Sequence, residues 1–282
     1  MRPSDFLYNK HRMTKIKLIA SDLDGTLLPY GTTELGPEVC GLIKQLNEQG
    51  IRFAPASGRQ LDNLHLLFEP VKDEITYVCQ NGAGAVADGK RLCFFPMDEA
   101  LGREIVTEVK RFPELNVFVS QFDCSYVEEG REAFFAHVRD VVRLKSKMVP
   151  DICSVIPGCS KISIYKEDGT EERLPYWQKK FGDRCTVVSG GPQWIDIMPK
   201  GVNKQTSMKV LLEYLGIRPE ETMVFGDNLN DLEMLEAAGI GAAVETAVPE
   251  ILACADVVVS SVEDAIKEVL AGKNRIEDWV RK

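Results

Sequence analysis

The sequence lacks the segments that would place a protein in a membrane or export it. None of its apolar runs reaches the roughly 18 residues that a membrane-spanning helix needs. The first residues, MRPSDFLYNKHRM, are mostly polar and lack the apolar core of a secretory signal. We interpret residues 1–14 as a short extension, and we expect a cytoplasmic protein with no membrane partner.

Cysteine and histidine patterns that would indicate a disulfide scaffold or a metal site are also missing. The eight cysteines include no CxxC pair, and the three histidines share no metal-ligand spacing. In a chain of 282 residues without a secretory signal, free thiols are the expected state. The sequence therefore predicts no disulfide framework and no catalytic histidine.

Basic residues are outnumbered: 34 Lys and Arg stand against 43 Asp and Glu, for a net charge of −9. Binding to nucleic acid without sequence preference depends on exposed Lys and Arg, so we expect no nucleic-acid partner. A small anionic substrate is still compatible with this charge, because a local site can differ from the whole surface. The 44% of hydrophobic residues is that of an ordinary globular protein able to form a core.

Strand-like and helix-like segments alternate in the N-terminal part of the chain. Residues 16–20, 51–56 and 75–79 are apolar runs typical of strands buried on both faces of a sheet. Between them, residues 37–49 and 60–68 predict helices, and the first of these has apolar residues at i, i+3, i+4 and i+7. This β-α-β-α-β order predicts an α/β fold with a doubly wound, Rossmann-like parallel sheet.

The same alternation returns near the C-terminus. Residues 222–225 and 240–244 predict strands, and residues 206–215 and 229–238 predict helices. The polar clusters in both parts of the chain follow predicted strands. In open α/β sheets, ligands bind at the carboxyl ends of the strands, so we expect the site at that edge.

The pattern changes between these two parts. Strand-like segments there follow one another around helices, which predicts a mixed, largely antiparallel α+β domain. We therefore predict a core domain made of residues 1–84 and 194–282, with an α+β cap domain of residues 85–193 inserted into it.

Two acidic clusters lie at the predicted ligand edge of the core sheet. Asp22 and Asp24 come directly after the first strand, and Asp227 and Asp231 follow a C-terminal strand. Carboxylates grouped beside buried strands are costly unless a cation pairs them, and Mg²⁺ prefers oxygen ligands. Turn chemistry and helix capping account for one Asp in each cluster but not for two clusters at equivalent strand ends. The pattern predicts a Mg²⁺ site.

A metal beside several carboxylates usually serves phosphate chemistry, so phosphate-binding groups are expected nearby. Ser57 lies at a predicted helix start, where backbone amides favour an anion. Lys204 is also near a helix start, where the dipole disfavours a cation unless it faces an anion. A capping role for Ser57 and a solvated position for Lys204 are the alternatives. Arg59 could either reach a phosphate or brace a loop.

Taken together, the motifs of the two core segments resemble those of a known family. The order DLDGT, SGR, a lysine at a helix start and GDNLND resembles the haloacid dehalogenase superfamily of phosphohydrolases. The insertion after the third strand, NGA at 81–83, GVNK and GDNLNDLEML resemble its Cof-type (IIB) branch. The resemblance extends from Lys15 to about Gly272. Gln80-Asn81 departs from the branch, which often has two asparagines there.

The resemblance implies roles for the acidic residues. Asp22 would be the nucleophile that forms an aspartyl-phosphate, and it would also ligate Mg²⁺. Asp24 would be the general acid for the leaving alcohol and then the general base for water, with its backbone carbonyl on the metal. Asp227 would ligate the metal directly. Asp231 would act indirectly, either by contacting the metal ligands or through a water molecule.

The resemblance also implies a phosphate site and a cap. The groups that would hold phosphoryl oxygens are the backbone amides of Leu23 and Gly58, the Ser57 hydroxyl, Lys204 and Asn230. The inserted domain would close over the site and contact the substrate.

We therefore expect a Mg²⁺-dependent phosphomonoesterase for small phosphorylated metabolites, with sugar phosphates as the leading class, in a monomer or small homo-oligomer. One alternative is a phosphomutase or phosphotransferase that uses the same aspartyl-phosphate. A different class, a non-catalytic module phosphorylated on one Asp for signalling, leaves Asp24, the second acidic cluster and the insertion unexplained.

Overall fold

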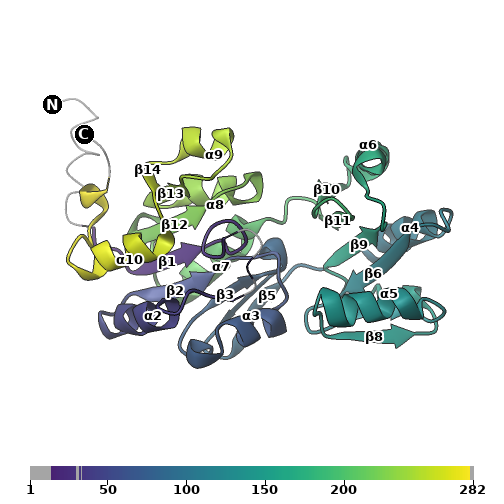
Figure 1. The fold of residues 1–282 in the computed structure, drawn as a ribbon, viewed down its shortest axis with the longest axis horizontal. Helices are drawn as coiled ribbons and strands as arrows, with labels where there is room; N and C mark the ends of the chain where they lie inside the picture. The colour runs from purple at the N-terminus through teal and green to yellow at the C-terminus, as the bar shows by residue number, and fades with distance from the viewer. Residues whose placement is uncertain (1–13, 30–31, 33, 280–282) are drawn as a thin grey trace. The chain divides into compact units, whose positions relative to one another are not determined.

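The computed structural model of the chain describes residues 14–29, 32 and 34–279. It divides into two compact units (Figure 1). The first unit contains the chain up to Arg59, Leu64–Cys93 and everything from Asn203 onward, and the second contains Gln60–Asn63 and Phe94–Val202. Apart from Thr14, the predicted N-terminal extension lies outside the described residues.

The first unit is built on a parallel sheet of five strands. Their order is β14 (Val257–Val259), β13 (Ile240–Val244), β12 (Thr222–Gly226), β1 (Leu18–Ser21) and β2 (Arg52–Pro55) (Figure 1). All neighbouring pairs are parallel. Every residue of β1, an interior strand of the sheet, is buried, as expected for a strand covered on both faces. The predicted α/β fold with a doubly wound parallel sheet is confirmed.

Among the described residues, the α-helices that belong wholly or partly to this unit are α2 (Val39–Glu48), α3 (Leu61–Leu67), α7 (Lys204–Leu215), α8 (Leu232–Ala237), α9 (Pro249–Cys254) and α10 (Val262–Leu270). Helix α2 packs on α10, and α7 packs on α8. Helix α7 begins at Lys204, two residues before the predicted start, because Asn203 and Thr206 form a capping box there. It ends at Gly216, whose φ of 64° is the left-handed conformation common after a helix.

The boundaries of the inserted segment differ from those predicted. Strand β3 (Tyr77–Cys79) is followed by β4 (Gly84–Ala87) and β5 (Lys90–Phe94), and the three form a separate sheet. Because β4 pairs with β3, residues 85–93 belong to the first unit and the second unit begins at Phe94 rather than at 85. At its other end the second unit extends to Val202 rather than 193, since Trp194–Pro199 forms the strand β11 of its sheet.

The second unit contains one mixed sheet of six strands. Their order is β10 (Cys185–Ser189), β11 (Trp194–Pro199), β9 (Lys161–Tyr165), β6 (Asn116–Ser120), β7 (Ser125–Glu128) and β8 (Ser146–Val149). Only the pair β7–β8 is parallel, and the other four pairs are antiparallel. The unit is the largely antiparallel α+β arrangement that its sequence predicts.

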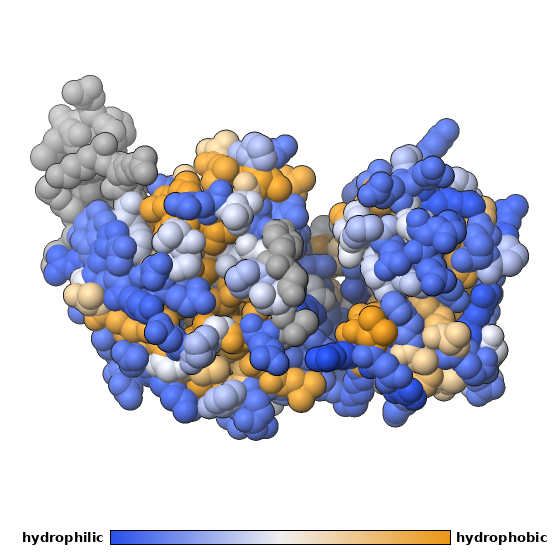
Figure 2. Space-filling view, viewed as in Figure 1, coloured by the Kyte–Doolittle hydropathy of each residue, from blue (hydrophilic) through white to orange (hydrophobic). Residues whose placement is uncertain are grey.

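Helices α4 (Glu99–Val109), α5 (Glu132–Ala136) and α6 (Leu174–Phe181) complete the second unit. Its main apolar core joins α4 and α6 to the sheet and includes the fully buried Trp177 and Phe181. Hydrophilic residues dominate the surface of each unit on the face shown in Figure 2. Within the described ranges, no helix is both long and apolar enough to cross a membrane. All eight cysteines are free thiols.

Candidate active site

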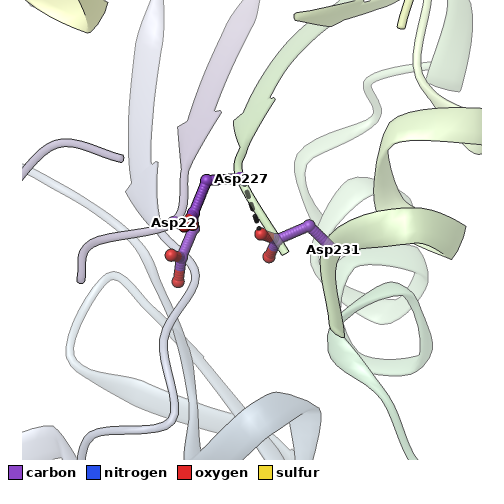
Figure 3. A group of neighbouring side chains, drawn as sticks. All are labelled: Asp22, Asp227 and Asp231. Atoms are coloured by element: carbon purple, nitrogen blue, oxygen red, sulfur yellow. Dashed lines mark hydrogen bonds between the residues drawn. The ribbon is translucent and has the colours of Figure 1, made fainter. Parts of the chain in front are cut away.

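The site forms where β1 and β12 end beside each other. In the register of this parallel pair Ser21 is opposite Phe225, so the residues that follow each strand emerge together. The backbone amide of Asp22 donates to the carbonyl of Phe225 over 2.9 Å. As a result, carboxylate oxygens of Asp22, Asp227 and Asp231 lie within 4.8 Å of one another (Figure 3), and all three residues are buried.

Lys204 is the cation of this cluster. Its side chain is fully buried, and its Nζ lies 2.5 Å from Asp22 Oδ1 and 2.6 Å from Asp231 Oδ1. The capping box formed by Asn203 sets the start of α7 and therefore the position of this lysine. The structure thus excludes the solvated surface position that was the alternative for Lys204.

Burial and pairing act against each other on the ionisation of this pair. Burial is the largest influence on the pKa of Asp22 and raises it to about 7, although Lys204 opposes this shift. Burial alone would lower the pKa of Lys204, but Asp22 and Asp231 outweigh it and the pKa is raised. Pairing therefore favours the charged form of Lys204, whereas burial disfavours the ionised form of Asp22.

The balance of charge fits a divalent cation. When ionised, the three carboxylates carry three negative charges against the single positive charge of Lys204. An excess of negative charge in a buried site is costly unless a cation compensates it. The donors are all hard oxygen atoms, the kind that Mg²⁺ prefers. The residues present therefore fit a divalent cation such as Mg²⁺.

Asp231 forms hydrogen bonds with the other parts of this site. Its Oδ2 accepts from the backbone amides of Asp227 at 3.0 Å and Asn228 at 3.2 Å, while its Oδ1 accepts from Lys204. Figure 3 shows the bond to the Asp227 amide as a dashed line. Asp231 thus orients both the loop that presents Asp227 and the lysine. These bonds are in keeping with an indirect role at a metal, which stays a prediction.

One contact in the site was not found from the sequence. Thr26 Oγ1 donates to Asp227 Oδ1 over 2.9 Å and lies 3.5 Å from Asp22 Oδ2. This hydroxyl joins the two acidic clusters directly. No role for Thr26 was predicted, and its place in the DLDGT motif was the only signal for it.

Of the predicted phosphate-binding groups, Leu23 adjoins Asp22 along the chain and Ser57 follows β2, the strand paired with β1. Ser57 is buried after β2, its amide donates to the Val78 carbonyl, and its Oγ accepts from the Arg59 amide at 3.2 Å. Burial raises the pKa of Asp22, and the hydrogen bond from the backbone amide of Leu23 to its carboxylate partly opposes that rise. The binding of phosphoryl oxygens stays a prediction for Ser57, Gly58, Leu23 and Asn230.

Residues 80–82 connect these groups through an unusual backbone. Gln80, Asn81 and Gly82 all have positive φ, at 53°, 54° and 89°, a conformation that is uncommon outside glycine and concentrates at functional sites. The backbone N–H of Asn81 donates to the Ser57 carbonyl over 3.0 Å, and the side-chain Nδ2 of Asn230 lies 3.5 Å from Asn81 Oδ1.

The glycine of this segment packs directly against the start of α7. Ser207 Oγ donates to the Gly82 carbonyl over 2.6 Å, and a Cβ on Gly82 would lie 1.8 Å from the Asn203 carbonyl oxygen. Residues 80–82 therefore hold the Ser57 loop against the helix end that carries Lys204. This role was not predicted, because NGA is visible in the sequence only as a family motif.

We expect Gly82→Ala to destabilise the fold by about 3 kcal/mol or more, because the new methyl group overlaps backbone and the φ disfavours alanine. Gly89→Ala is the matched control, since Gly89 also has a positive φ, of 68°, but a Cβ there would meet nothing within 4 Å. Urea denaturation of both variants measures the difference. Equal destabilisation of the two would contradict the close packing of Gly82.

Arg59 is paired with Asp24. Its Nη2 donates to Asp24 Oδ1 over 2.5 Å and its Nε to Asp24 Oδ2 over 3.0 Å. The Asp24 carboxylate is thus bound by Arg59, whereas the Asp22 carboxylate is bound by Lys204. The structure thus pairs Arg59 with a candidate catalytic carboxylate, a partner that neither alternative had named, and whether Arg59 also reaches a phosphate stays a prediction.

Comparison with known proteins identifies the family of this chain. A family model described as haloacid dehalogenase-like hydrolase matches residues 19–270. The chain is 30% identical over 244 residues to the 5-amino-6-(5-phospho-D-ribitylamino)uracil phosphatase YbjI of Escherichia coli (strain K12), covering 85% of this chain and 89% of that protein. It is 26% identical over 246 residues to the HMP-PP phosphatase of Citrobacter koseri, covering 84% and 87% of the two proteins.

Solved structures agree as well. A crystal structure from Eubacterium rectale has 31% identity and a TM-score of 0.81, covering 90% of this chain and 98% of that one. A haloacid dehalogenase-like hydrolase from Bacteroides thetaiotaomicron has 24% identity and a TM-score of 0.79, covering 90% and 100% of the two chains, and it supports the fold. By its family match, its relatives and its fold, the chain belongs to the haloacid dehalogenase-like hydrolases, in the branch of Cof-type phosphatases.

Proposed function

We propose that this phosphatase is a Mg²⁺-dependent phosphomonoesterase that hydrolyses small phosphorylated metabolites through an aspartyl-phosphate on Asp22. The observation that supports this most is the buried Asp22 carboxylate, which Lys204 contacts at 2.5 Å beside two further carboxylates. When all three carboxylates are ionised their charge exceeds that of Lys204, and this excess in a buried site favours a bound cation.

Mg²⁺ would be held by the Asp22 and Asp227 carboxylates together with the backbone carbonyl of Asp24, with Asp231 orienting them. When bound, the ion neutralises charge on the phosphoryl group and on the attacking carboxylate.

The side chains of the protein would carry out two transfers. In the first, an oxygen of Asp22 forms a bond to phosphorus as the bond to the ester oxygen breaks, and Asp24 gives that oxygen its proton. In the second, water attacks the same phosphorus, Asp24 accepts the proton of the water, and Asp22 is released together with inorganic phosphate. Lys204 would offset the repulsion between the carboxylate and the phosphate dianion.

The substrate class follows from the relatives and remains part of the proposal. The E. coli relative is named for a phosphate ester on a ribityl chain, and the C. koseri relative is named as a phosphatase of another small molecule. We propose small phosphorylated metabolites as substrates, with sugar phosphates and sugar-alcohol phosphates first. The second unit would serve as the cap that contacts the substrate.

Phosphate release from a panel of sugar phosphates, sugar-alcohol phosphates, nucleotides, flavin mononucleotide and pyridoxal phosphate tests the proposal. We expect stoichiometric inorganic phosphate and dephosphorylated product from at least one sugar or sugar-alcohol phosphate. Phosphorylated isomers without free phosphate would instead identify a mutase. Release from nucleotides alone would contradict the substrate class but not the phosphatase activity.

Removing divalent cations with a chelator should abolish phosphate release, and added Mg²⁺ should restore it. Mg²⁺ should also raise the thermal unfolding midpoint, because a cation that binds only the folded protein stabilises it. Ca²⁺ should inhibit, since its larger and looser coordination shell would disturb the geometry of attack. Full activity in chelator, with no shift of the unfolding midpoint by Mg²⁺, would contradict the metal site.

A further inference from the structure

The pair between Arg59 and Asp24 carries an inference that goes beyond the proposed function. Both oxygens of the Asp24 carboxylate are bound by one guanidinium, at 2.5 and 3.0 Å. The side chain of Asp24 is 52% exposed and that of Arg59 is 24% exposed. An exposed carboxylate has many accessible rotamers, so without this partner Asp24 would have no fixed orientation.

Arg59 is itself held at its backbone. Its amide donates to Ser57 Oγ over 3.2 Å, and its carbonyl accepts from the Gln80 amide over 3.0 Å. The guanidinium therefore extends from an anchored point in the loop that follows β2. A planar guanidinium that binds a carboxylate with two parallel bonds fixes the orientation of that carboxylate as well as its distance.

We propose that Arg59 is a positioning residue that orients Asp24 for its proton transfers. This inference rests on the proposed function, in which the O–H bond of Asp24 breaks as the leaving oxygen gains the proton. The electron pair stays on Asp24 as a carboxylate, and Arg59 binds that carboxylate in the geometry seen here. If the Asp24 carboxyl group were displaced, it would transfer its proton poorly, because a proton donor must be within hydrogen-bond reach of the acceptor.

The competing role for Arg59 is direct binding of phosphoryl oxygens, and the two roles differ in how they depend on the leaving group. Orientation of Asp24 matters when the leaving group is a basic alkoxide that needs a proton. It matters little for p-nitrophenolate, which is stable as an anion. Phosphoryl binding would matter equally for both esters, and it would also affect the binding of inorganic phosphate.

The test compares Arg59→Ala and Arg59→Lys with the wild type on two esters. These are p-nitrophenyl phosphate, followed in the first turnover, and the alkyl phosphate that the wild type hydrolyses fastest. For Arg59→Ala we expect a loss of about 10- to 100-fold in kcat on the alkyl phosphate, part of the full effect of acid–base catalysis. The first-turnover release of nitrophenolate and the inhibition constant of phosphate should change less than about 3-fold.

Arg59→Lys should lie between the wild type and Arg59→Ala, because lysine keeps the charge but not the two parallel bonds. Arg52→Ala is the matched control: Arg52 is another partly exposed arginine of the first unit, with Asp88 3.8 Å away, and its loss should leave both rates unchanged. Circular dichroism checks folding, and Arg59→Lys carries the test if Arg59→Ala does not fold.

A double-mutant cycle with Asp24→Asn separates this inference from the proposed function. If Arg59 acts through Asp24, Arg59→Ala should cost less than about 3-fold once Asp24 is already replaced. Equal losses on both esters with weaker phosphate inhibition, an undiminished loss in the Asp24→Asn background, or no loss on either ester would each overturn the inference. If Asp24→Asn alone shows no dependence on the leaving group, the acid–base part of the proposed function fails, whatever Arg59 does.

Discussion

Replacing Asp22 by Asn is expected to reduce hydrolysis of every phosphate ester by about 10⁴-fold or more, the scale of loss when an enzyme loses its nucleophile. The amide oxygen of Asn is a poor nucleophile, and the bond that would begin hydrolysis does not form. The substitution also removes one of the charged groups proposed to bind Mg²⁺. The loss should not depend on the leaving group, since every ester needs the same attack on phosphorus.

Phosphate release from p-nitrophenyl phosphate and from the best alkyl phosphate measures this loss. Asp88→Asn is the matched control, because Asp88 is an exposed aspartate of the same unit with φ of 49°, a conformation that Asn adopts readily. The variant at position 22 should still fold, since it relieves repulsion among three buried carboxylates. Appreciable turnover by folded Asp22→Asn would exclude Asp22 as the nucleophile.

Asp24→Asn is expected to separate the two transfers of the reaction. General acid–base catalysis contributes about 10²–10⁴-fold, and most when the leaving group is a basic alkoxide. Formation of the aspartyl-phosphate should therefore fall by about that factor with a sugar phosphate but much less with p-nitrophenyl phosphate. Hydrolysis of the intermediate should be slow with both, because the base that accepts the proton of water is gone.

Rapid mixing of Asp24→Asn with p-nitrophenyl phosphate should consequently show a burst of nitrophenolate followed by a stalled steady state. Mass spectrometry of the quenched protein should find one added phosphate on the peptide that contains Asp22. With the sugar phosphate, little intermediate should accumulate, since its formation is already slow. Equal losses on both esters, without a burst and without added mass, would rule out the acid–base role of Asp24.

The division of the chain into units shows where sequence patterns were sufficient and where they were not. The alternation of apolar runs and amphipathic segments predicted the parallel sheet, because burial on both faces of a strand is visible in its composition. The ends of the insertion were misplaced, because the sequence of a strand such as β4 or β11 does not reveal which sheet the strand joins. Their partners are chosen by hydrogen bonding with distant strands.

The predicted site residues show the same division. The places of Asp22 and Asp227 after buried strands were evident from the sequence, and the register of β1 with β12 brings them together. For Arg59 the sequence left open whether it reaches a phosphate or braces a loop, and its pairing with Asp24 was not anticipated. The run of positive φ at 80–82 was not anticipated, because Gln80 is an unusual residue for that conformation.

The fold class, the acidic clusters at the ends of parallel strands and the family motifs could all be predicted from the sequence alone. Those features depend on periodicity and on neighbours along the chain, which any single sequence displays. The partners of each polar group became visible only in the folded chain: Lys204 contacts Asp22 across 182 positions, and Thr26 contacts Asp227 across 201. Such contacts arise when strands align and helix ends pack against loops, and local patterns do not encode that alignment.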